Sequence, residues 1–149
     1  MNKYFLYFSF TGNGDFLAEL LKDKGYTPIK AELIKEPKKI GFFQILKYGG
    51  RAMMNKKEKL KDLEFNPKEE DIVIVGSPIW NDRLSTPITT VLDKYSLNKE
   101  TTKFILYPAG EGTKKSLKQI AKMGFKLAPV VISYPLKKEE QARALIEEL

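Results

Sequence analysis

The sequence has no cysteine and no histidine among its 149 residues. Without cysteine the chain forms no disulfide, offers no thiolate and cannot ligate an iron–sulfur cluster through sulfur. Without histidine it has no Ser-His-Asp triad, and with both residues absent it lacks the usual zinc ligands. Any redox chemistry must therefore belong to a bound cofactor, which the protein positions and tunes.

The sequence also lacks long apolar runs and a recognisable export signal. No run approaches the ~20 residues that span a bilayer. The N-terminus has one lysine and a brief aromatic run without a small-residue cleavage site, so we expect a first strand rather than a signal peptide. By default we expect a cytoplasmic location. A length of 149 residues with 42% hydrophobic residues predicts one ordered domain, residues 1–149.

Positive charge is concentrated in one segment. Residues 35–61 contain nine basic and two acidic residues, and nine minus two equals the whole formal net charge of +7. Two interpretations of this segment stay open. In the one we prefer, a helix covers the sheet and keeps its lysines in solvent. In the other, the segment is a docking surface for an acidic protein or, with less support, for anionic lipid or nucleic acid.

Strand and helix signals alternate five times along the chain. Strands are expected at residues 4–7, 27–33, 71–77, 104–107 and 128–134. Helices are expected between and after them, including two helical pieces within 35–63 that a hinge at Gly49-Gly50 separates. This alternation predicts a parallel sheet covered on both faces.

Three of the expected strands end in loops rich in glycine, serine, threonine, asparagine and proline. These loops span residues 9–15, 77–87 and 108–113. In open parallel sheets ligands bind beyond the carboxyl ends of the strands, at a topological switch point. The three loops are therefore expected to form one site.

The first loop lies between a strand and a helix, where free backbone N–H groups and the helix dipole suit a phosphate. A dinucleotide fingerprint is incomplete because Leu17 stands at the third glycine position, although Glu32 lies where a ribose-binding acid is expected. A P-loop is excluded because no Gly-Lys-Ser/Thr follows. The hydroxyls of Ser9 and Thr11 and the amide of Asn13 suit a phosphate monoester. The alternative is a glycine-containing turn that binds nothing.

Two motifs in the order of the chain resemble those of the flavodoxin family. Ser9-Phe10-Thr11-Gly12-Asn13-Gly14 resembles its phosphate loop, usually Ser/Thr-x-Thr-Gly-x-Thr. Gly76-Ser77-Pro78-Ile79-Trp80, followed by Pro87, resembles its second flavin loop. The likeness extends along nearly the whole chain, including the aromatic and Gly-Gly segment at 42–50. It implies a flavodoxin-like α/β fold, a three-layer α/β/α sandwich with a five-stranded parallel sheet in the order 2-1-3-4-5, and noncovalent binding of FMN.

The resemblance also implies roles for particular residues. The first loop would hold the phosphate, Trp80 would lie against the isoalloxazine, and the backbone of 109–112 would contact the pyrimidine edge. The Asn81-Asp82 peptide would turn to accept a hydrogen bond from the reduced flavin, because asparagine tolerates positive φ. The implied FMN contacts are Ser9, Phe10, Thr11, Gly12, Asn13, Gly14, Asp15, Ser77, Pro78, Ile79, Trp80, Asn81, Asp82, Ala109, Gly110, Glu111 and Gly112. No catalytic or metal-binding residue is assigned.

The first loop departs from the family pattern at two positions. Gly14 replaces the usual last hydroxyl residue, so the phosphate loses one donor. Asp15 places a carboxylate beside the phosphate, which suits the helix dipole but repels the phosphate if it points inward. The third loop also lacks the aromatic residue that many flavodoxins stack on the flavin.

The leading functional hypothesis is an electron carrier that shuttles electrons on FMN between redox partner proteins, a reductase and an acceptor. The alternative is an FMN-dependent NAD(P)H:quinone or flavin reductase with a substrate pocket roofed by Phe42, Phe43 and Tyr48. A third possibility is a flavin-free binding module on the same scaffold.

Overall fold

A computed structural model of the chain describes residues 1–36, 41–54, 56–110 and 112–149, without the side chains of Phe42 and Ile45. The predicted contact Glu111, two lysines of the basic segment and the predicted roof side chain of Phe42 therefore lie outside the described residues. Among the described residues, no helix has the length and apolar character needed to cross a bilayer.

Five parallel strands form the sheet. In spatial order they are β2 (Thr27–Lys30), β1 (Lys3–Tyr7), β3 (Ile72–Trp80), β5 (Lys103–Tyr107) and β6 (Val130–Val131). The two-residue β4 (Arg83–Leu84) pairs with β3 in antiparallel fashion and adds a sixth strand that the sequence did not predict. Apart from β4, the parallel strands have the predicted order 2-1-3-4-5.

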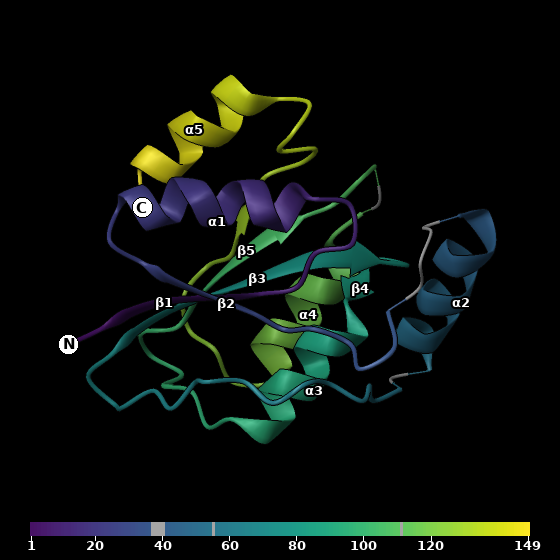
Figure 1. The fold of residues 1–149 in the computed structure, drawn as a ribbon, viewed down its shortest axis with the longest axis horizontal. Coiled ribbons are helices and arrows are strands. Elements are labelled where there is room, and N and C mark those ends of the chain that lie inside the picture. The colour runs from purple at the N-terminus through teal and green to yellow at the C-terminus, as the bar shows by residue number, and fades with distance from the viewer. Residues whose placement is uncertain (37–40, 55, 111) are drawn as a thin grey trace.

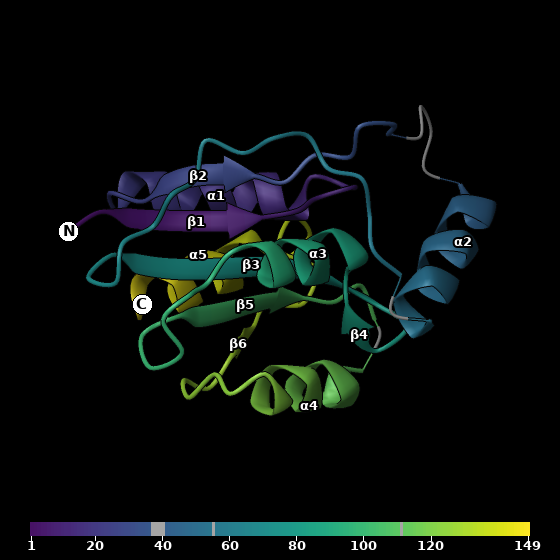
Figure 2. The ribbon, with the colours of Figure 1, turned by 90° about the horizontal axis from the view of Figure 1, so that it is seen from below.

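Helices cover both faces of this sheet. Figures 1 and 2 show α1 (Asn13–Asp23) and α5 (Glu139–Glu147) on one face, and α3 (Thr86–Lys94) and α4 (Lys114–Lys122) on the other. The side chains of β1 alternate between the two faces. Phe5 and Tyr7 join the core beneath α1 and α5, and Leu6 joins the core on the opposite face. The predicted three-layer α/β/α sandwich is confirmed, and it brings the carboxyl ends of all five parallel strands to one edge.

The helix α2 (Phe42–Met53) lies beyond this carboxyl edge rather than over a face of the sheet (Figure 2). The prediction that a helix in 35–61 covers the sheet is therefore wrong. An extended segment, residues 56–66, covers that part of the sheet instead. Leu60 and Leu63 pack against the core, Phe65 is buried within it, and Leu60 forms a β-bridge with Leu33.

The predicted hinge at Gly49-Gly50 is also wrong, because α2 runs through both glycines as one helix. Tyr48 and Ala52 are both buried. At a spacing of four residues they share one face of the helix, so packing on both sides of the glycine pair holds it helical. The second helical piece predicted in 35–63 is absent from the described residues, because 56–63 are non-helical.

Candidate functional site

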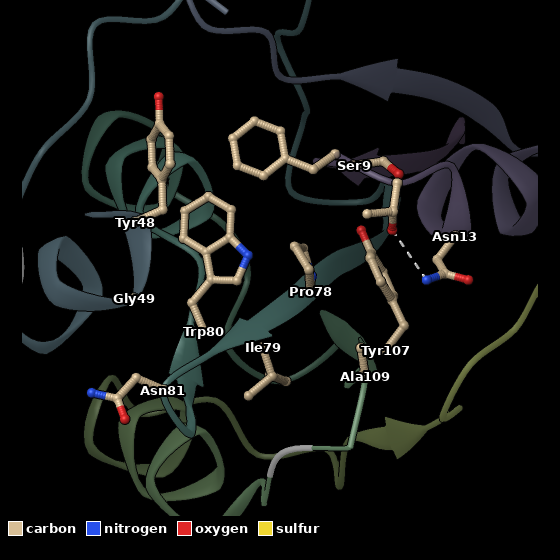
Figure 3. Close-up of a pocket in the computed structure, with 12 residues that line it drawn as sticks. Ser9, Asn13, Tyr48, Gly49, Pro78, Ile79, Trp80, Asn81, Tyr107 and Ala109 are labelled. Atoms are coloured by element: carbon tan, nitrogen blue, oxygen red, sulfur yellow. Dashed lines mark hydrogen bonds between the residues drawn. The ribbon is translucent and has the colours of Figure 1, made fainter. Parts of the chain in front are cut away.

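A cavity of about 150 Å³ opens at the carboxyl ends of β1, β3 and β5, where α2 forms a further wall (Figure 3). Figure 3 shows Ser9 and Asn13 at one end of the cavity and Trp80 and Tyr48 at the other. The predicted residues that line it are Ser9, Phe10, Thr11, Asn13, Pro78, Ile79, Trp80, Asn81 and Ala109. Residues from all three predicted loops therefore meet at one cavity, and their role as FMN contacts stays a prediction.

The first loop forms a polar cradle at the start of α1. Gly12 adopts a left-handed conformation with φ of 87°, and α1 begins at the next residue. The Ser9 hydroxyl oxygen accepts hydrogen bonds from the N–H groups of Gly12 and Gly14, each at 3.1 Å. Because this oxygen already accepts two hydrogen bonds, the Ser9 hydroxyl group interacts with a nearby anion chiefly by donating its hydrogen. Together with the helix N-terminus, this arrangement suits a phosphate group.

Gly14 is required by close packing beneath the loop rather than by its backbone angles. A β-carbon at this position would lie 2.8 Å from the Tyr107 hydroxyl oxygen and 2.9 Å from both Ser9 and Tyr7. The Tyr107 hydroxyl donates to the Phe8 carbonyl and so fastens β5 to the end of β1. Two tyrosines thus occupy the space that the family's usual hydroxyl residue would need.

The carboxylate of Asp15 is held by two partners and does not line the cavity. It accepts a hydrogen bond from the Tyr7 hydroxyl at 2.9 Å and pairs with the Lys30 ammonium at 2.9 Å. Burial, followed by the hydrogen bond to Asp15, raises the pKa of Tyr7 well above its usual value. Tyr7 therefore stays a protonated donor at neutral pH, and the pairing with Lys30 weakens any repulsion between Asp15 and a phosphate.

The second predicted loop, 77–87, is largely a β-hairpin followed by the start of α3, which corrects the sequence prediction. β3 continues to Trp80, and Asn81 and Asp82 turn the chain with φ of 51° and 62°. Positive φ at both central residues is the mark of a type I′ turn, whose twist suits a two-residue hairpin. At the base of the hairpin, the buried Ser77 hydroxyl oxygen accepts the Ser85 N–H at 3.0 Å, so Ser77 closes the hairpin and does not line the cavity.

Asp82 faces α4 instead of the cavity. Its carboxylate accepts the Lys115 N–H at 3.2 Å, and its backbone carbonyl accepts the Ser116 N–H at 2.8 Å. These bonds satisfy N–H groups in the first turn of α4. Asp82 therefore caps α4 and fixes the hairpin to the helix. Gly12, Gly14, Gly110 and Gly112 are likewise predicted contacts that are not among the residues lining the cavity.

Trp80 belongs to an aromatic cluster that forms one wall of the cavity. Phe10 stacks on the indole with ring centroids 5.2 Å apart and planes tilted by 21°. The ring of Tyr48, from α2, lies 5.2 Å from Trp80, and Phe8 meets it edge-on at 5.6 Å. Pairs at these distances stabilise one another beyond the area that they bury. The cluster therefore holds Trp80 in place at the cavity.

A fourth segment, residues 133–138 after β6, contacts the site and was not predicted. The Leu136 N–H donates to the side-chain oxygen of Asn13 at 3.1 Å. Gly110 has φ of 95°, which favours glycine, and the Tyr134 hydroxyl oxygen lies 2.5 Å from where a β-carbon at this position would be. Only the sheet topology could have predicted this contact, because the loop after the last parallel strand must emerge at the same edge as the other three loops.

No protein-family model matches the sequence, and no curated protein matches it. Solved structures do resemble the fold. The crystal structure of a flavoprotein from Lactobacillus acidophilus NCFM in complex with FMN has a TM-score of 0.64 and 17% identity, covering 94% of this chain and 97% of that one. A candidate flavoprotein from Bacteroides uniformis ATCC 8492 has a TM-score of 0.68 and 16% identity, covering 98% of each chain.

A further candidate flavoprotein, from Bacteroides eggerthii DSM 20697, has a TM-score of 0.65 and 17% identity, covering 99% of this chain and 96% of that one. Although the sequence identities are low, the TM-scores of 0.64 to 0.68 over almost the whole of each chain establish a shared architecture. The chain has the flavodoxin-like α/β fold.

Proposed function

We propose that the protein binds FMN noncovalently at this cavity and carries electrons between protein partners. The observation that supports it is the juxtaposition of a polar cradle at the start of α1 with an aromatic wall at Trp80. This pair of features lies at the carboxyl edge of a fold shared with a flavoprotein crystallised with FMN. Bound FMN would supply one- and two-electron chemistry, which a chain without cysteine or histidine lacks in its own side chains.

The residues that line the cavity fit the two ends of this cofactor. Ser9, Thr11 and Asn13 would hold the phosphate together with N–H groups at the start of α1. Trp80 would exclude water from one side of the ring system. The cavity of about 150 Å³ is smaller than the roughly 300–1,000 Å³ of typical ligand pockets, so part of the ring system would lie exposed to solvent. An exposed edge is what electron transfer to another protein needs.

One observation favours the alternative of an FMN-dependent NAD(P)H:quinone or flavin reductase. Tyr48 lines the cavity, as a roof over a second substrate would. Phe43, the other described side chain expected in that roof, is 83% exposed and does not line the cavity. The carrier therefore remains the better supported proposal.

The test is to purify the protein, identify any released cofactor and then assay the FMN-loaded protein with NAD(P)H. We expect FMN to be released on denaturation in a ratio close to one per chain. We expect no NAD(P)H oxidation by the protein alone and reduction only after a separate flavoprotein reductase is added. A protein that takes up no FMN would contradict the proposal, and steady NAD(P)H oxidation without the added enzyme would establish the reductase instead.

A further inference from the structure

The helix α2 turns an apolar surface away from the rest of the molecule. Its buried residues Tyr48 and Ala52 lie on one side. On the opposite side by helical periodicity lie Leu46, Met53 and Met54, which are 55%, 57% and 65% exposed. Phe43, also strongly exposed, falls on the same side. We call Phe43, Leu46, Met53 and the C-cap residue Met54 the outer face of α2.

Such a surface is unusual for a helix of a globular domain, which normally buries its apolar stripe. Three of the four outer-face residues are aromatic or methionine, the types enriched at the centres of protein interfaces. A contiguous exposed apolar patch rimmed by polar residues marks an interaction site. The outer face therefore has the character of a binding surface.

Exposed lysines of the basic segment lie on α2 and beside it. Within 35–61, Arg51, Lys57 and Lys61 form ion pairs with acidic residues of the chain. In the described part of that segment, the lysines that take part in no ion pair are Lys35, Lys47, Lys56 and Lys59. Lys35, Lys47 and Lys59 also line a groove of about 380 Å³ behind α2. The same segment accounts for the whole net charge of +7, so this end of the molecule attracts acidic partners.

The outer face reaches the rim of the cavity at one edge, through Met53. The side-chain amide of Asn81 donates to the sulfur of Met53 at 3.2 Å, and Asn81 itself lines the cavity. Tyr48, on the buried side of α2, lies against Trp80. A partner on the outer face would therefore sit beside the aromatic wall of the cavity.

We propose that the outer face of α2, together with the lysines on and beside this helix, is the docking surface for an acidic redox protein. The inference rests on the proposed function, because electron transfer is the reason to dock beside the cavity. A second copy of this chain is disfavoured as the partner, because its own basic segment would face this one and the two positive charges would repel. An anionic membrane is the weaker fit, because α2 is a single 12-residue helix that contains two glycines.

The test measures binding of the full-length FMN-loaded protein to two haem proteins, acidic cytochrome b5 and basic cytochrome c. Amide NMR spectra of the labelled protein locate the contact, and titrations at low and high salt give the affinity. We expect cytochrome b5 to perturb residues 41–54 and to bind more weakly as salt is added. We expect cytochrome c not to bind.

The matched variants are Leu46→Ser/Met54→Ser on α2 and Leu117→Ser on α4. The helix α4 also exposes a leucine among lysines, Leu117 with Lys114, Lys115, Lys118 and Lys122, but it covers a face of the sheet. We expect the α2 double variant to weaken cytochrome b5 binding by about tenfold or more, as loss of interface anchors does, and Leu117→Ser to change it less than about twofold. Both should keep the wild-type melting temperature and FMN content, because the changed side chains are exposed.

Equal affinities of the two variants, or binding of cytochrome c as tight as that of cytochrome b5, would overturn the docking surface. Binding to phosphatidylserine vesicles without binding to cytochrome b5 would also overturn it and would assign the face to membranes. FMN content, measured on the same samples, separates the two proposals. If the protein binds cytochrome b5 at α2 but takes up no FMN, the result would support the docking surface and contradict the proposed function.

Discussion

Gly14 lies against Tyr7 and Tyr107, and this close approach determines which residues the phosphate loop can contain. A β-carbon there would lie under 3 Å from three side-chain atoms, including the Tyr107 hydroxyl oxygen. The tyrosines also join elements beneath the loop: Tyr107 joins β5 to the end of β1 through Phe8, and Tyr7 joins β1 to α1 through Asp15. The loop therefore has one hydroxyl donor fewer for a phosphate, but it packs closely on the two tyrosines.

The change Gly14→Ala tests this packing. Overpacking of this kind costs about 1–3 kcal/mol, so we expect the free energy of unfolding in urea to fall by that amount. The matched control is Gly50→Ala in α2, where a β-carbon would have no neighbour within 4 Å. There we expect a gain of about 0.5–1 kcal/mol, because alanine is the better helix residue. A Gly14→Ala protein as stable as the wild type would show that the tyrosines do not restrict this position.

At the residue scale, the sequence was informative where a motif is local. Ser9, Thr11 and Asn13 are close in sequence, so their meeting at a strand–helix turn could be predicted. Tyr107 in β5 and Leu136 in the segment after β6 reach the same loop from distant parts of the chain, and no local pattern indicates such contacts. The partners of Asp15 likewise depend on the position of Lys30 in the neighbouring strand.

At the scale of elements, the β3–β4 hairpin and α4 behave as one unit. The hairpin turn places Asp82 at the first turn of α4, and the Gln119 side-chain oxygen accepts the Leu84 N–H at 2.9 Å. Trp80 and Asn81, which line the cavity, immediately precede Asp82. The position of this cavity wall therefore depends on the cap of α4.

Substitutions at Asp82 separate the cap from the turn. We expect Asp82→Gly, which suits positive φ but removes the carboxylate, to lower the free energy of unfolding by about 0.5–2 kcal/mol through the lost cap. Asp82→Ala should cost more, because alanine also resists the φ of 62° at this position. Asp82→Asn keeps the acceptor oxygen and tolerates positive φ, so it should stay within about 0.5 kcal/mol of the wild type. Equal stabilities of the glycine and asparagine variants, measured by urea unfolding, would refute the cap.

Element boundaries were predictable where one local signal dominates. The β-branched run at 71–77 predicted β3 because a buried strand needs such residues. The glycine pair in α2 predicted a hinge wrongly, because burial of Tyr48 and Ala52 overrides the weak helix propensity of glycine. The hairpin at 80–84 was predicted as a loop, since its two-residue strand β4 is too short to show a periodic pattern.

For the whole molecule, the alternation of strands and helices predicted a parallel sheet with its loops at one edge, and the resemblance to the flavodoxin family predicted the order of the strands. What alternation could not predict is the position of α2. The extended segment 56–66 covers the sheet face that this helix would otherwise cover, and it leaves α2 beside the cavity. The helix of the basic segment thereby lies at the same edge of the sheet as the candidate site.

The central claim is that the cradle at the start of α1 and the wall at Trp80 bind the two ends of one FMN molecule. The most direct test is a titration of the FMN-free protein with FMN and, separately, with riboflavin, which lacks the phosphate. Fluorescence of Trp80 reports binding at the wall, since it is the single tryptophan. Equilibrium dialysis measures the bound flavin independently.

We predict saturable quenching by FMN at one molecule per chain. Riboflavin should bind at least about tenfold more weakly, because a hydrogen bond to a charged group contributes about 1.5–3 kcal/mol. Thr11→Val should weaken FMN and leave riboflavin nearly unchanged. FMN that neither quenches Trp80 nor is retained in dialysis would contradict the account, as would riboflavin bound as tightly as FMN.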